Sequence, residues 1–171
     1  VGQGFMATSP IQMAKVAAQI GNGGYWVSPH LVHAIKKSNG RVIYPNADTS
    51  KISWVDSKEI EVIKDGMRRV VKYGSGRYYA DMDSIKIAGK TGTSQNPHGE
   101  DHGWFIAFAP VDDPQIAVAV LIENGGYGSI SAAPIASLMI EKYLTREINR
   151  SRVYNYVKNF KHFGSGSLQP D

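Results

Sequence analysis

The sequence of 171 residues contains no cysteine. This absence excludes disulfides, cysteine-based metal sites and a cysteine nucleophile, and it fits an oxidising or a reducing compartment equally well. The sequence also lacks an apolar run of about 18 residues, the length that a membrane-spanning helix needs. Its first residue is Val1 rather than Met, and no signal peptide pattern follows, so we expect the chain to be part of a longer protein.

Acidic residues are slightly outnumbered, because 19 lysines and arginines oppose 15 aspartates and glutamates and give a formal net charge of +4. Without a dense basic patch, this bias does not indicate nucleic-acid binding. We expect residues 145–171 to form a basic C-terminal tail or exposed helix, whose last residues, GSGSLQPD, are disordered. The cations of this region are Arg146, Arg150, Arg152, Lys158 and Lys161.

The segment TSPIQMAKVAAQIGNGG has the three- and four-residue apolar spacing of an amphipathic helix. Ser9 is placed to cap this helix, Pro10 occupies its first position, and Gln12 completes a capping box. Glycines from Gly21 onward end it. Many of its residues are small, so we expect another element to approach it closely.

Two more segments are predicted to be helical. SWVDSKEIEVIKDGMRRVVKYGSG begins at a cap formed by Asp56 or Ser57 and ends at Gly74. Its predicted apolar stripe consists of Ile60, Ile63, Met67, Val70 and Val71. The closing helix, SAAPIASLMIEKYL, is expected to turn four side chains inward, Ile135, Leu138, Met139 and Tyr143.

The remaining regular segments predict β-strands. YWVSPHLVHAIKKSNGRVIYP contains two extended pieces joined by an Asn-Gly pair, the strongest short hairpin signal. In SIKIAGKTGTS, Ile85 and Ile87 alternate with Lys86 and Ala88. GWFIAFAP and QIAVAVLIE are apolar on both faces, as strands covered by helices on both sides are. The expected fold is an α/β protein of the α+β type, an antiparallel sheet with helices packed on both faces.

The polar end of the first of these three strands carries the tetrapeptide Lys90, Thr91, Gly92 and Thr93. Lys90 supplies a positive charge, while Thr91 and Thr93 supply hydroxyls that strand alternation places on one face. Gly92 leaves room for a ligand or another backbone, and a free strand edge can pair with an extended peptide. These features predict a site for a peptide that ends in a carboxylate, with the Thr93 N–H as an oxyanion donor. The plain alternative is a strand end with Gly at a bulge and Lys in solvent.

Five separated segments carry a further signal: GQGFMATSPIQMAKVAAQIGNGG, SPHLV, GMRRVVKYGSG, IAGKTGTSQ and DHGWFIAFAPVDDPQIAVAVLIENGGYGSISAAPIA. In this order they resemble the transpeptidase domain of class B penicillin-binding proteins, most closely the penicillin-binding protein 2 branch. The resemblance covers residues 1–144 and implies the C-terminal portion of a serine β-lactamase-like fold. It also implies a sheet of five strands with two supplied from outside this segment. We therefore expect exposed apolar surface on the strand edges and on the first helix.

The resemblance implies a serine-type D,D-transpeptidase that crosslinks peptidoglycan stem peptides and binds β-lactams. A serine attacks the penultimate D-Ala carbonyl, releases the terminal D-Ala and forms an acyl-enzyme, which an amine of a neighbouring stem peptide then resolves. Lys90 would supply positive potential near the substrate carboxylate, and the hydroxyls of Thr91 and Thr93 would bind it. Gly92 would keep the strand open, with Ser94 continuing the substrate-binding strand, and the Thr93 N–H would be one oxyanion donor.

The nucleophile motif of this class, S-x-x-K, is missing, because no serine of the chain has a lysine three residues later. Ser94-Gln95-Asn96 matches S-x-N, but it follows the Lys-Thr-Gly strand, whereas the family has that motif before it. We interpret the match as coincidental and expect this chain to be inactive alone. The implied partners are the rest of its transpeptidase domain and cell-wall synthesis proteins such as a glycosyltransferase. The parent is expected outside the cytoplasmic membrane, anchored by an upstream helix, with no cofactor.

Other polar and aromatic side chains have plainer interpretations. The loop HGEDH has four potential zinc ligands at a spacing that matches no metal motif, so a polar loop is favoured; they are His98, Glu100, Asp101 and His102. Aromatic residues at strand spacing are expected in the core rather than in a ligand stack, namely Trp104, Phe105 and Phe108. Tyr127 is assigned to a connector, and Tyr78 and Tyr79 could border a substrate groove. The alternative functions are a β-lactamase-related sensor and a non-catalytic D-Ala-D-Ala peptide-binding module.

Overall fold

The computed structural model describes residues 6–45 and 49–161. In chain order the elements are α1 (Pro10–Gly21), β1 (Tyr25–Val27), β2 (Ile35–Lys36), β3 (Val42–Ile43), β4 (Thr49–Lys51), α2 (Ser57–Lys72), α3 (Arg77–Ala80), β5 (Ala88–Ser94), β6 (His102–Ala109), β7 (Ile116–Ile122), α4 (Ala132–Thr145) and α5 (Ser151–Lys158). None of the helices in this described part has the length and apolar composition to cross a membrane. The segment GSGSLQPD, for which disorder was expected, lies outside the described residues.

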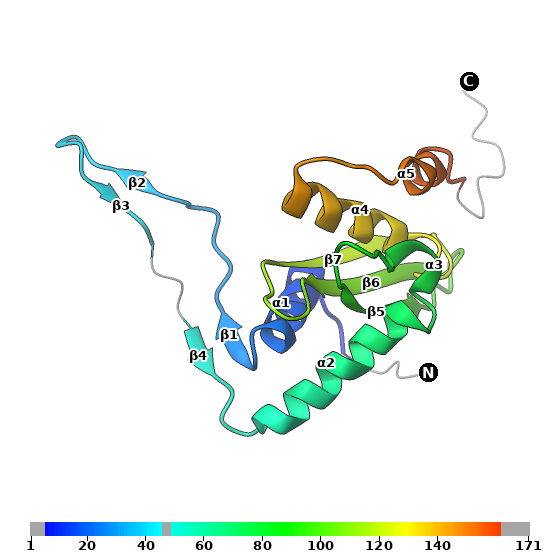
Figure 1. Ribbon diagram of the computed structural model, residues 1–171, viewed down its shortest axis with the longest axis horizontal. Coiled ribbons are helices and arrows are strands. Elements are labelled where there is room, and N and C mark those ends of the chain that lie inside the picture. The colour runs from blue at the N-terminus through cyan, green and yellow to red at the C-terminus, as the bar shows by residue number, and fades with distance from the viewer. Residues whose placement is uncertain (1–5, 46–48, 162–171) are drawn as a thin grey trace.

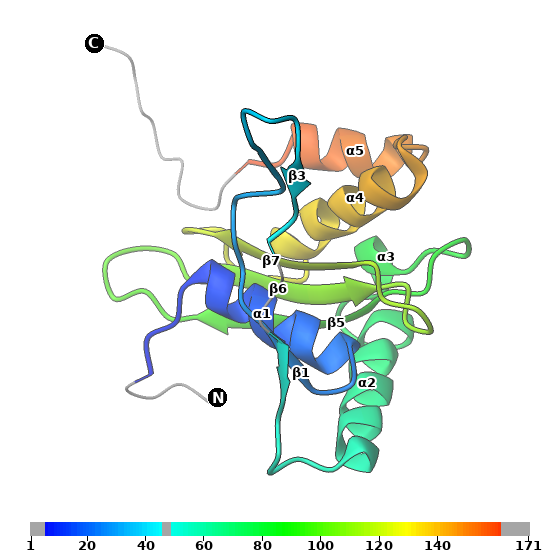
Figure 2. The same cartoon turned by 90° about the vertical axis from the view of Figure 1, so that its left-hand side faces the viewer.

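The sheet that carries the site consists of β5, β6 and β7, antiparallel and in that order. Its register pairs Thr91 with Phe105 and Phe105 with Val120, so these three side chains share one face. α4 covers that face, α1 covers the opposite face, and α2 packs along β5 (Figures 1 and 2). The predicted fold class, an antiparallel sheet with helices on both faces, is confirmed.

An apolar cluster fills each interface between the sheet and its helices. Under α4 the buried side chains include Phe105, Ala107, Val118, Val120, Ala133, Ala136 and Ile140. Under α1 they are Ala17, Met67, Ala88, Ile106 and Phe108. The approach of α1 is close, because a Cβ atom at Gly21 would lie 3.0 Å from the Phe108 ring. Burying a ring of this size stabilises the fold by roughly 2–3 kcal/mol.

The first two helices begin where the sequence predicts. At α1, Ser9 is the N-cap and its backbone N–H donates to Gln12 Oε1 at 2.8 Å. At α2, Asp56 is the N-cap, and its carboxylate accepts from the Lys58 N–H at 3.2 Å while Glu59 accepts from the Asp56 N–H at 2.8 Å. These bonds satisfy backbone donors that no helix can satisfy internally, and they fix both starting points.

A long two-stranded arm extends from the body between α1 and α2 (Figure 1). β1 pairs with β4 near the body and β2 pairs with β3 toward the tip, both antiparallel. The predicted turn is present, with Gly40 at a φ of +81° and its N–H donating to the Lys37 carbonyl at 2.9 Å. Apolar side chains are exposed on the arm, as Leu31 is, and on α1, where Ile11 and Val16 are exposed. The exposure on α1 agrees with the expectation for a partial domain.

The predicted buried face of α4 was partly wrong. Leu138 is buried and Ile135 is half-buried, but Met139 and Tyr143 are both about half exposed. The buried residues are mostly small or polar, namely Ala132, Ala133, Pro134, Ala136, Ser137, Leu138, Ile140 and Glu141. Small side chains allow α4 to approach the sheet closely, and the polar ones contact the segment that precedes α5.

Two smaller expectations also fail. Ile63, assigned to the apolar stripe of α2, is 43% exposed, although Ile60 and Met67 of the same stripe are buried. β5 begins only at Ala88, so Ile85 and Ile87 are buried in the segment before the strand. Ala88 is itself fully buried, on the α1 side of the sheet, rather than on a polar face opposite Ile87.

Candidate functional site

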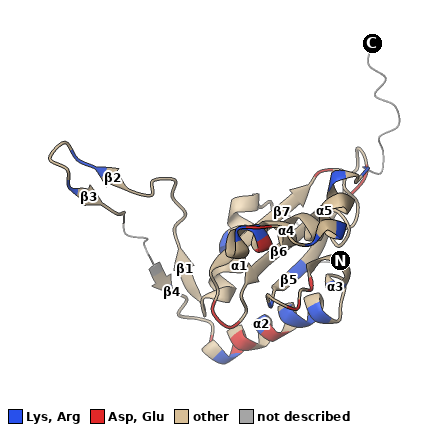
Figure 3. Cartoon of the chain, turned by 45° about the horizontal axis from the view of Figure 1, so that its top comes forward, with Lys and Arg blue, Asp and Glu red and all other residues tan. Residues whose placement is uncertain are grey.

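β5 is an edge strand of its sheet, and it carries the whole Lys-Thr-Gly-Thr sequence. Lys90 is exposed, whereas residues 91–94 are half-buried. Figure 3 shows basic segments in blue on several elements, β5 and α2 among them. The register places Thr91 and Thr93 on the face that α4 covers, opposite Phe105 and Gly103, and places Lys90 on the other face. The strand therefore presents an ammonium and two hydroxyls from its two faces around one edge.

The Lys90 ammonium donates to the carbonyl oxygen of the next residue, Thr91, at 2.6 Å. In an antiparallel pair, residues alternate between those that direct both backbone groups at the neighbouring strand and those that direct neither. A Thr91 carbonyl at the outer edge would thus place the Thr93 N–H, two residues on, at the same edge. This is the position that a peptide substrate or an oxyanion would need.

Sequence reasoning missed the residue that contacts Thr91. Ser75, in the turn between α2 and α3, has its Oγ 2.7 Å from Thr91 Oγ1. The contact joins residues 16 positions apart. The Gly-Ser-Gly sequence around Ser75 predicted a turn, but nothing in it indicated which strand the turn would meet.

The glycine-rich loop before α4 packs on the backbone of β5 and β6. A Cβ atom at Gly128 would lie 2.5 Å from the Gly92 carbonyl oxygen, and one at Gly103 would overlap the Ser131 hydroxyl. The loop is therefore a fitted connector, and its Tyr127 side chain is 70% exposed. Phe105 lies in the sheet core beneath and is fully buried, as Phe108 is, so the core interpretation holds for these two rings, whereas Trp104 is only half-buried.

The polar loop between β5 and β6 is held by its own side chains. Asp101 Oδ1 accepts from the Asn96 N–H at 3.2 Å, and His102 Nδ1 accepts from the Asn124 N–H at 3.0 Å. Asn96 Nδ2 also donates to Asn124 Oδ1 at 2.7 Å. In residues 6–45 and 49–161, no three His, Asp or Glu side chains are grouped to hold a metal ion. Asp101 and His102 thus serve to join this loop to the end of β7.

The two tyrosines proposed as a groove border differ in environment. Tyr78 is 78% exposed, while the Tyr79 ring stacks on Tyr156 with centroids 4.5 Å apart. Tyr79 therefore packs against the C-terminal helix α5 rather than toward β5.

The three-stranded antiparallel sheet between helices, with Lys-Thr-Gly-Thr on its edge strand, agrees with the resemblance to penicillin-binding transpeptidases. The family model of the penicillin binding protein transpeptidase domain matches residues 1–141. The chain belongs to this family.

The curated relatives are peptidoglycan D,D-transpeptidases. The chain is 34% identical over 179 residues to the peptidoglycan D,D-transpeptidase MrdA of Haemophilus influenzae, covering 91% of this chain and 26% of that protein. It is 35% identical over 151 residues to the peptidoglycan D,D-transpeptidase PbpA of Mycolicibacterium smegmatis, covering 82% of this chain and 30% of that protein. The chain thus spans about a quarter to a third of the length of these relatives.

Solved structures give the same family. The imipenem acyl-enzyme complex of penicillin-binding protein A from Mycobacterium tuberculosis superposes with a TM-score of 0.75 at 32% identity, covering 84% of this chain and 32% of that one. Penicillin-binding protein 2 of Pseudomonas aeruginosa, in complex with WCK 5153, gives a TM-score of 0.70 at 36% identity, with the same two coverages. The first of these structures is an acyl-enzyme, so a relative of this fold has been solved with imipenem bound covalently.

Proposed function

We propose that this chain supplies the substrate-binding strand of a peptidoglycan D,D-transpeptidase that crosslinks stem peptides by acyl transfer and binds β-lactams. The observation that carries the proposal is the edge position of β5, with Lys90 exposed and the Thr91 hydroxyl at the surface of the sheet. Family membership supports the reaction class, and the acyl-enzyme structure of a relative supports β-lactam binding.

The roles follow from the chemistry of the strand. The D-Ala-D-Ala terminus is an anion, so the Lys90 ammonium attracts it and the hydroxyls of Thr91 and Thr93 donate to its oxygens. Gly92 carries no side chain, so a peptide or β-lactam can lie along the strand edge. As the tetrahedral intermediate forms, the Thr93 N–H donates to the developing oxyanion, and a second donor comes from the nucleophile's own backbone. Ser94 continues the strand beyond the scissile bond.

The chain as printed has no S-x-x-K serine. We therefore propose that a segment outside it supplies the nucleophile, and that the 171 residues alone form no acyl-enzyme. That segment would pack on the free edges of this part of the domain. The parent protein would act outside the cytoplasmic membrane, where stem peptides are crosslinked, together with a glycosyltransferase.

A fluorescent penicillin tests the proposal. A chimaera is made in which the upstream part of a relative's transpeptidase domain, with its S-x-x-K and S-x-N motifs, precedes residue 1. After incubation and a denaturing gel, the chimaera is expected to be labelled and the 171-residue chain is not. The variant Lys90→Ala is expected to label on the order of 100-fold more slowly, as when an active-site electrostatic contact is lost. Lys86→Ala is the matched control, because Lys86 is an exposed lysine paired with Asp112.

Three outcomes separate the alternatives. Covalent label on the isolated chain would overturn the assignment of the nucleophile to another segment. Equal labelling rates in Lys90→Ala and Lys86→Ala would remove Lys90 from the site. Saturable, reversible binding of a D-Ala-D-Ala peptide, without any labelling of the folded chimaera, would favour the non-catalytic peptide-binding module.

A further inference from the structure

The hydroxyl pair formed by Ser75 and Thr91 sets a condition on anion binding at β5. Their oxygens lie 2.7 Å apart, and either one can be the donor. Each hydroxyl has a single hydrogen, and a carboxylate can only accept. When Thr91 donates to a carboxylate, its hydrogen is used, so Ser75 must be the donor to Thr91 Oγ1. A chain of hydrogen bonds in one direction also strengthens each of its members.

We propose that Ser75 is a positioning residue that aims the Thr91 hydroxyl at the substrate carboxylate, and that Arg150 holds the turn carrying Ser75 in place. The inference rests on the proposed function, because it assigns a second layer to the same site. It also gives a role to the basic segment beyond residue 141, where the match to the family model ends.

The turn that carries Ser75 is fixed at both ends. On its α2 side the Gly76 N–H donates to the Val70 carbonyl at 3.1 Å, and the Arg77 N–H donates to the Gly74 carbonyl at 3.2 Å. Gly76 is buried, and a Cβ atom there would lie 3.6 Å from the Phe105 ring. On its other side the turn continues directly into α3, so the position of α3 sets the position of Ser75.

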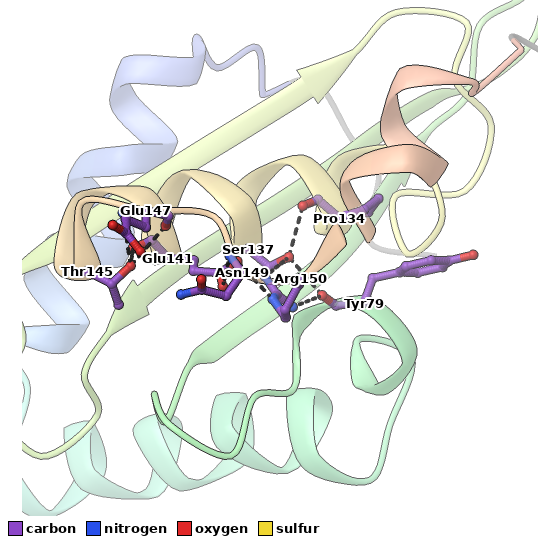
Figure 4. Close-up of polar contacts among 8 residues, drawn as sticks. All are labelled: Tyr79, Pro134, Ser137, Glu141, Thr145, Glu147, Asn149 and Arg150. Carbon is purple, nitrogen blue, oxygen red and sulfur yellow. Dashed lines mark hydrogen bonds and ion pairs between the residues drawn. The ribbon is translucent and has the colours of Figure 1, made fainter. Parts of the chain in front are cut away.

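Arg150 ties α3 to α4 (Figure 4). Its Nη1 donates to the Tyr79 carbonyl of α3 at 2.9 Å, its Nη2 donates to Ser137 Oγ at 3.0 Å, and its Nε lies 3.1 Å from Glu141 Oε2. Ser137 Oγ itself lies 2.7 Å from the Tyr79 carbonyl. Three acceptors on two helices thus converge on one planar guanidinium, a geometry that lysine cannot reproduce.

Two further contacts support the same attachment. The Tyr79 ring stacks on Tyr156 of α5 with an interplanar angle of 27°, and the Tyr156 hydroxyl donates to the Ile130 carbonyl at 3.0 Å. Glu141, only 5% exposed, also accepts from the Asn149 N–H at 3.0 Å. The segment from Asn149 through α5 therefore contacts both α3 and α4.

Carboxylate preference is the readout, because a general loss of structure does not change it. The chimaera described above is assayed with a β-lactam that has a free carboxylate and, separately, with the methyl ester of the same compound. The ratio of the two acylation rates measures recognition of the anion alone. Ser75→Ala is expected to lower this ratio about tenfold, the effect of one hydrogen bond to a charged group. Ser75→Thr, which keeps a hydroxyl, is expected to restore it, and the exposed Ser84 supplies the control Ser84→Ala.

Arg150→Ala and Arg150→Lys are expected to lower the ratio in the same direction, with Arg152→Ala as the control of equal charge on the exposed surface of α5. Hydrogen exchange of the same proteins provides a readout independent of activity. In Arg150→Ala, protection should fall in residues 75–80 and stay unchanged in β7. An unchanged carboxylate preference in Ser75→Ala, or unchanged protection of residues 75–80 in Arg150→Ala, would overturn the inference.

The same assay distinguishes a failure of the proposed function from a failure of the positioning role of Ser75. If the two compounds acylate the unsubstituted chimaera at equal rates, β5 does not recognise the carboxylate, and the proposed roles of Thr91 and Thr93 fail. If it prefers the free carboxylate and Ser75→Ala keeps that preference, the proposed function stands and the positioning role of Ser75 does not.

Discussion

Gly128 lies against the backbone of β5 at Gly92. A Cβ atom at position 128 would stand 2.5 Å from the Gly92 carbonyl oxygen and would overlap the backbone of Trp104. These neighbours are main-chain atoms inside a sheet, so they cannot move aside as a flexible side chain can. The loop before α4 is therefore seated on β5 and β6 by the absence of a side chain.

Gly128→Ala is expected to lower the free energy of unfolding by roughly 1–3 kcal/mol, the cost of an overpacked contact. Because the clash is with the strand that carries Lys90 and Thr93, the variant is also expected to slow β-lactam acylation of the chimaera. Denaturant unfolding and gel labelling measure the two effects. If the free energy of unfolding of Gly128→Ala equals that of the unsubstituted protein, the loop does not pack against β5 and β6 as described.

Gly66→Ala is the matched substitution in the opposite direction. Gly66 lies inside α2, and a Cβ atom there would have no atom within 4 Å. Alanine has the higher helix propensity, so the free energy of unfolding is expected to rise by about 1 kcal/mol. The same denaturant titration measures this change. A loss of stability would mean that position 66 does not have the free space that the structure gives it.

The parts of the fold that sequence predicts well are those set by local chemistry. The cap at Ser9, the cap at Asp56 and the turn at Gly40 each depend on residues within three positions of one another. The strands β6 and β7 are long apolar runs with a short turn between them, and they pair as predicted. The strand that carries Lys90 to Thr93 was also predicted, and it lies at an edge of its sheet.

The parts that sequence predicts poorly depend on distant partners. In α4, apolar spacing indicated Met139 and Tyr143 as inward residues, but the helix buries Ser137 and Glu141 instead. Polar residues can be buried there because Arg150 supplies their partner, and no periodicity within α4 shows this. Ser75 was missed for the same reason, since its contact with Thr91 of β5 joins residues 16 positions apart.

The Glu141–Arg150 pair is expected to be essential to stability, unlike the surface pairs. Glu141→Gln removes the charge from a side chain that is 6% exposed and leaves the guanidinium partly buried without its counter-ion. The free energy of unfolding is expected to fall by about 3 kcal/mol, the range for breaking a buried pair. Thermal or denaturant unfolding measures the change.

Asp112→Asn makes the same carboxylate-to-amide change at the surface and serves as the control. Asp112 lies 2.8 Å from Lys86, and both side chains are mostly exposed. The hydrogen bond from Lys86 lowers the pKa of Asp112, and the positive charge of Lys86 adds to this effect. Because solvent screens an exposed pair of this kind, we expect no measurable loss of stability. Equal effects of the two substitutions would contradict the structural role of the buried pair.

Tyr156 is expected to make stability depend on alkaline pH. Burial of the phenol, and then the neighbouring Tyr79, raise the pKa of Tyr156 from 10.0 to about 12. The folded protein therefore keeps this proton at a pH where the unfolded chain has lost it. The contribution to stability is complete below pH 10.0 and is lost as the pH rises from there to about 12.

The test compares the unsubstituted protein with Tyr156→Phe by measuring the free energy of unfolding of each at a series of pH values. Lysines also titrate at alkaline pH, but they do so in both proteins, so the difference between the two isolates the contribution of Tyr156. Phenylalanine keeps the stack on Tyr79 but has no proton to lose and cannot donate to the Ile130 carbonyl. The difference between the two proteins should be constant at neutral pH and shrink above pH 10.0, the ordinary pKa of the phenol. A difference that stays constant through this range would mean that α5 does not hold the Tyr156 hydroxyl against the Ile130 carbonyl.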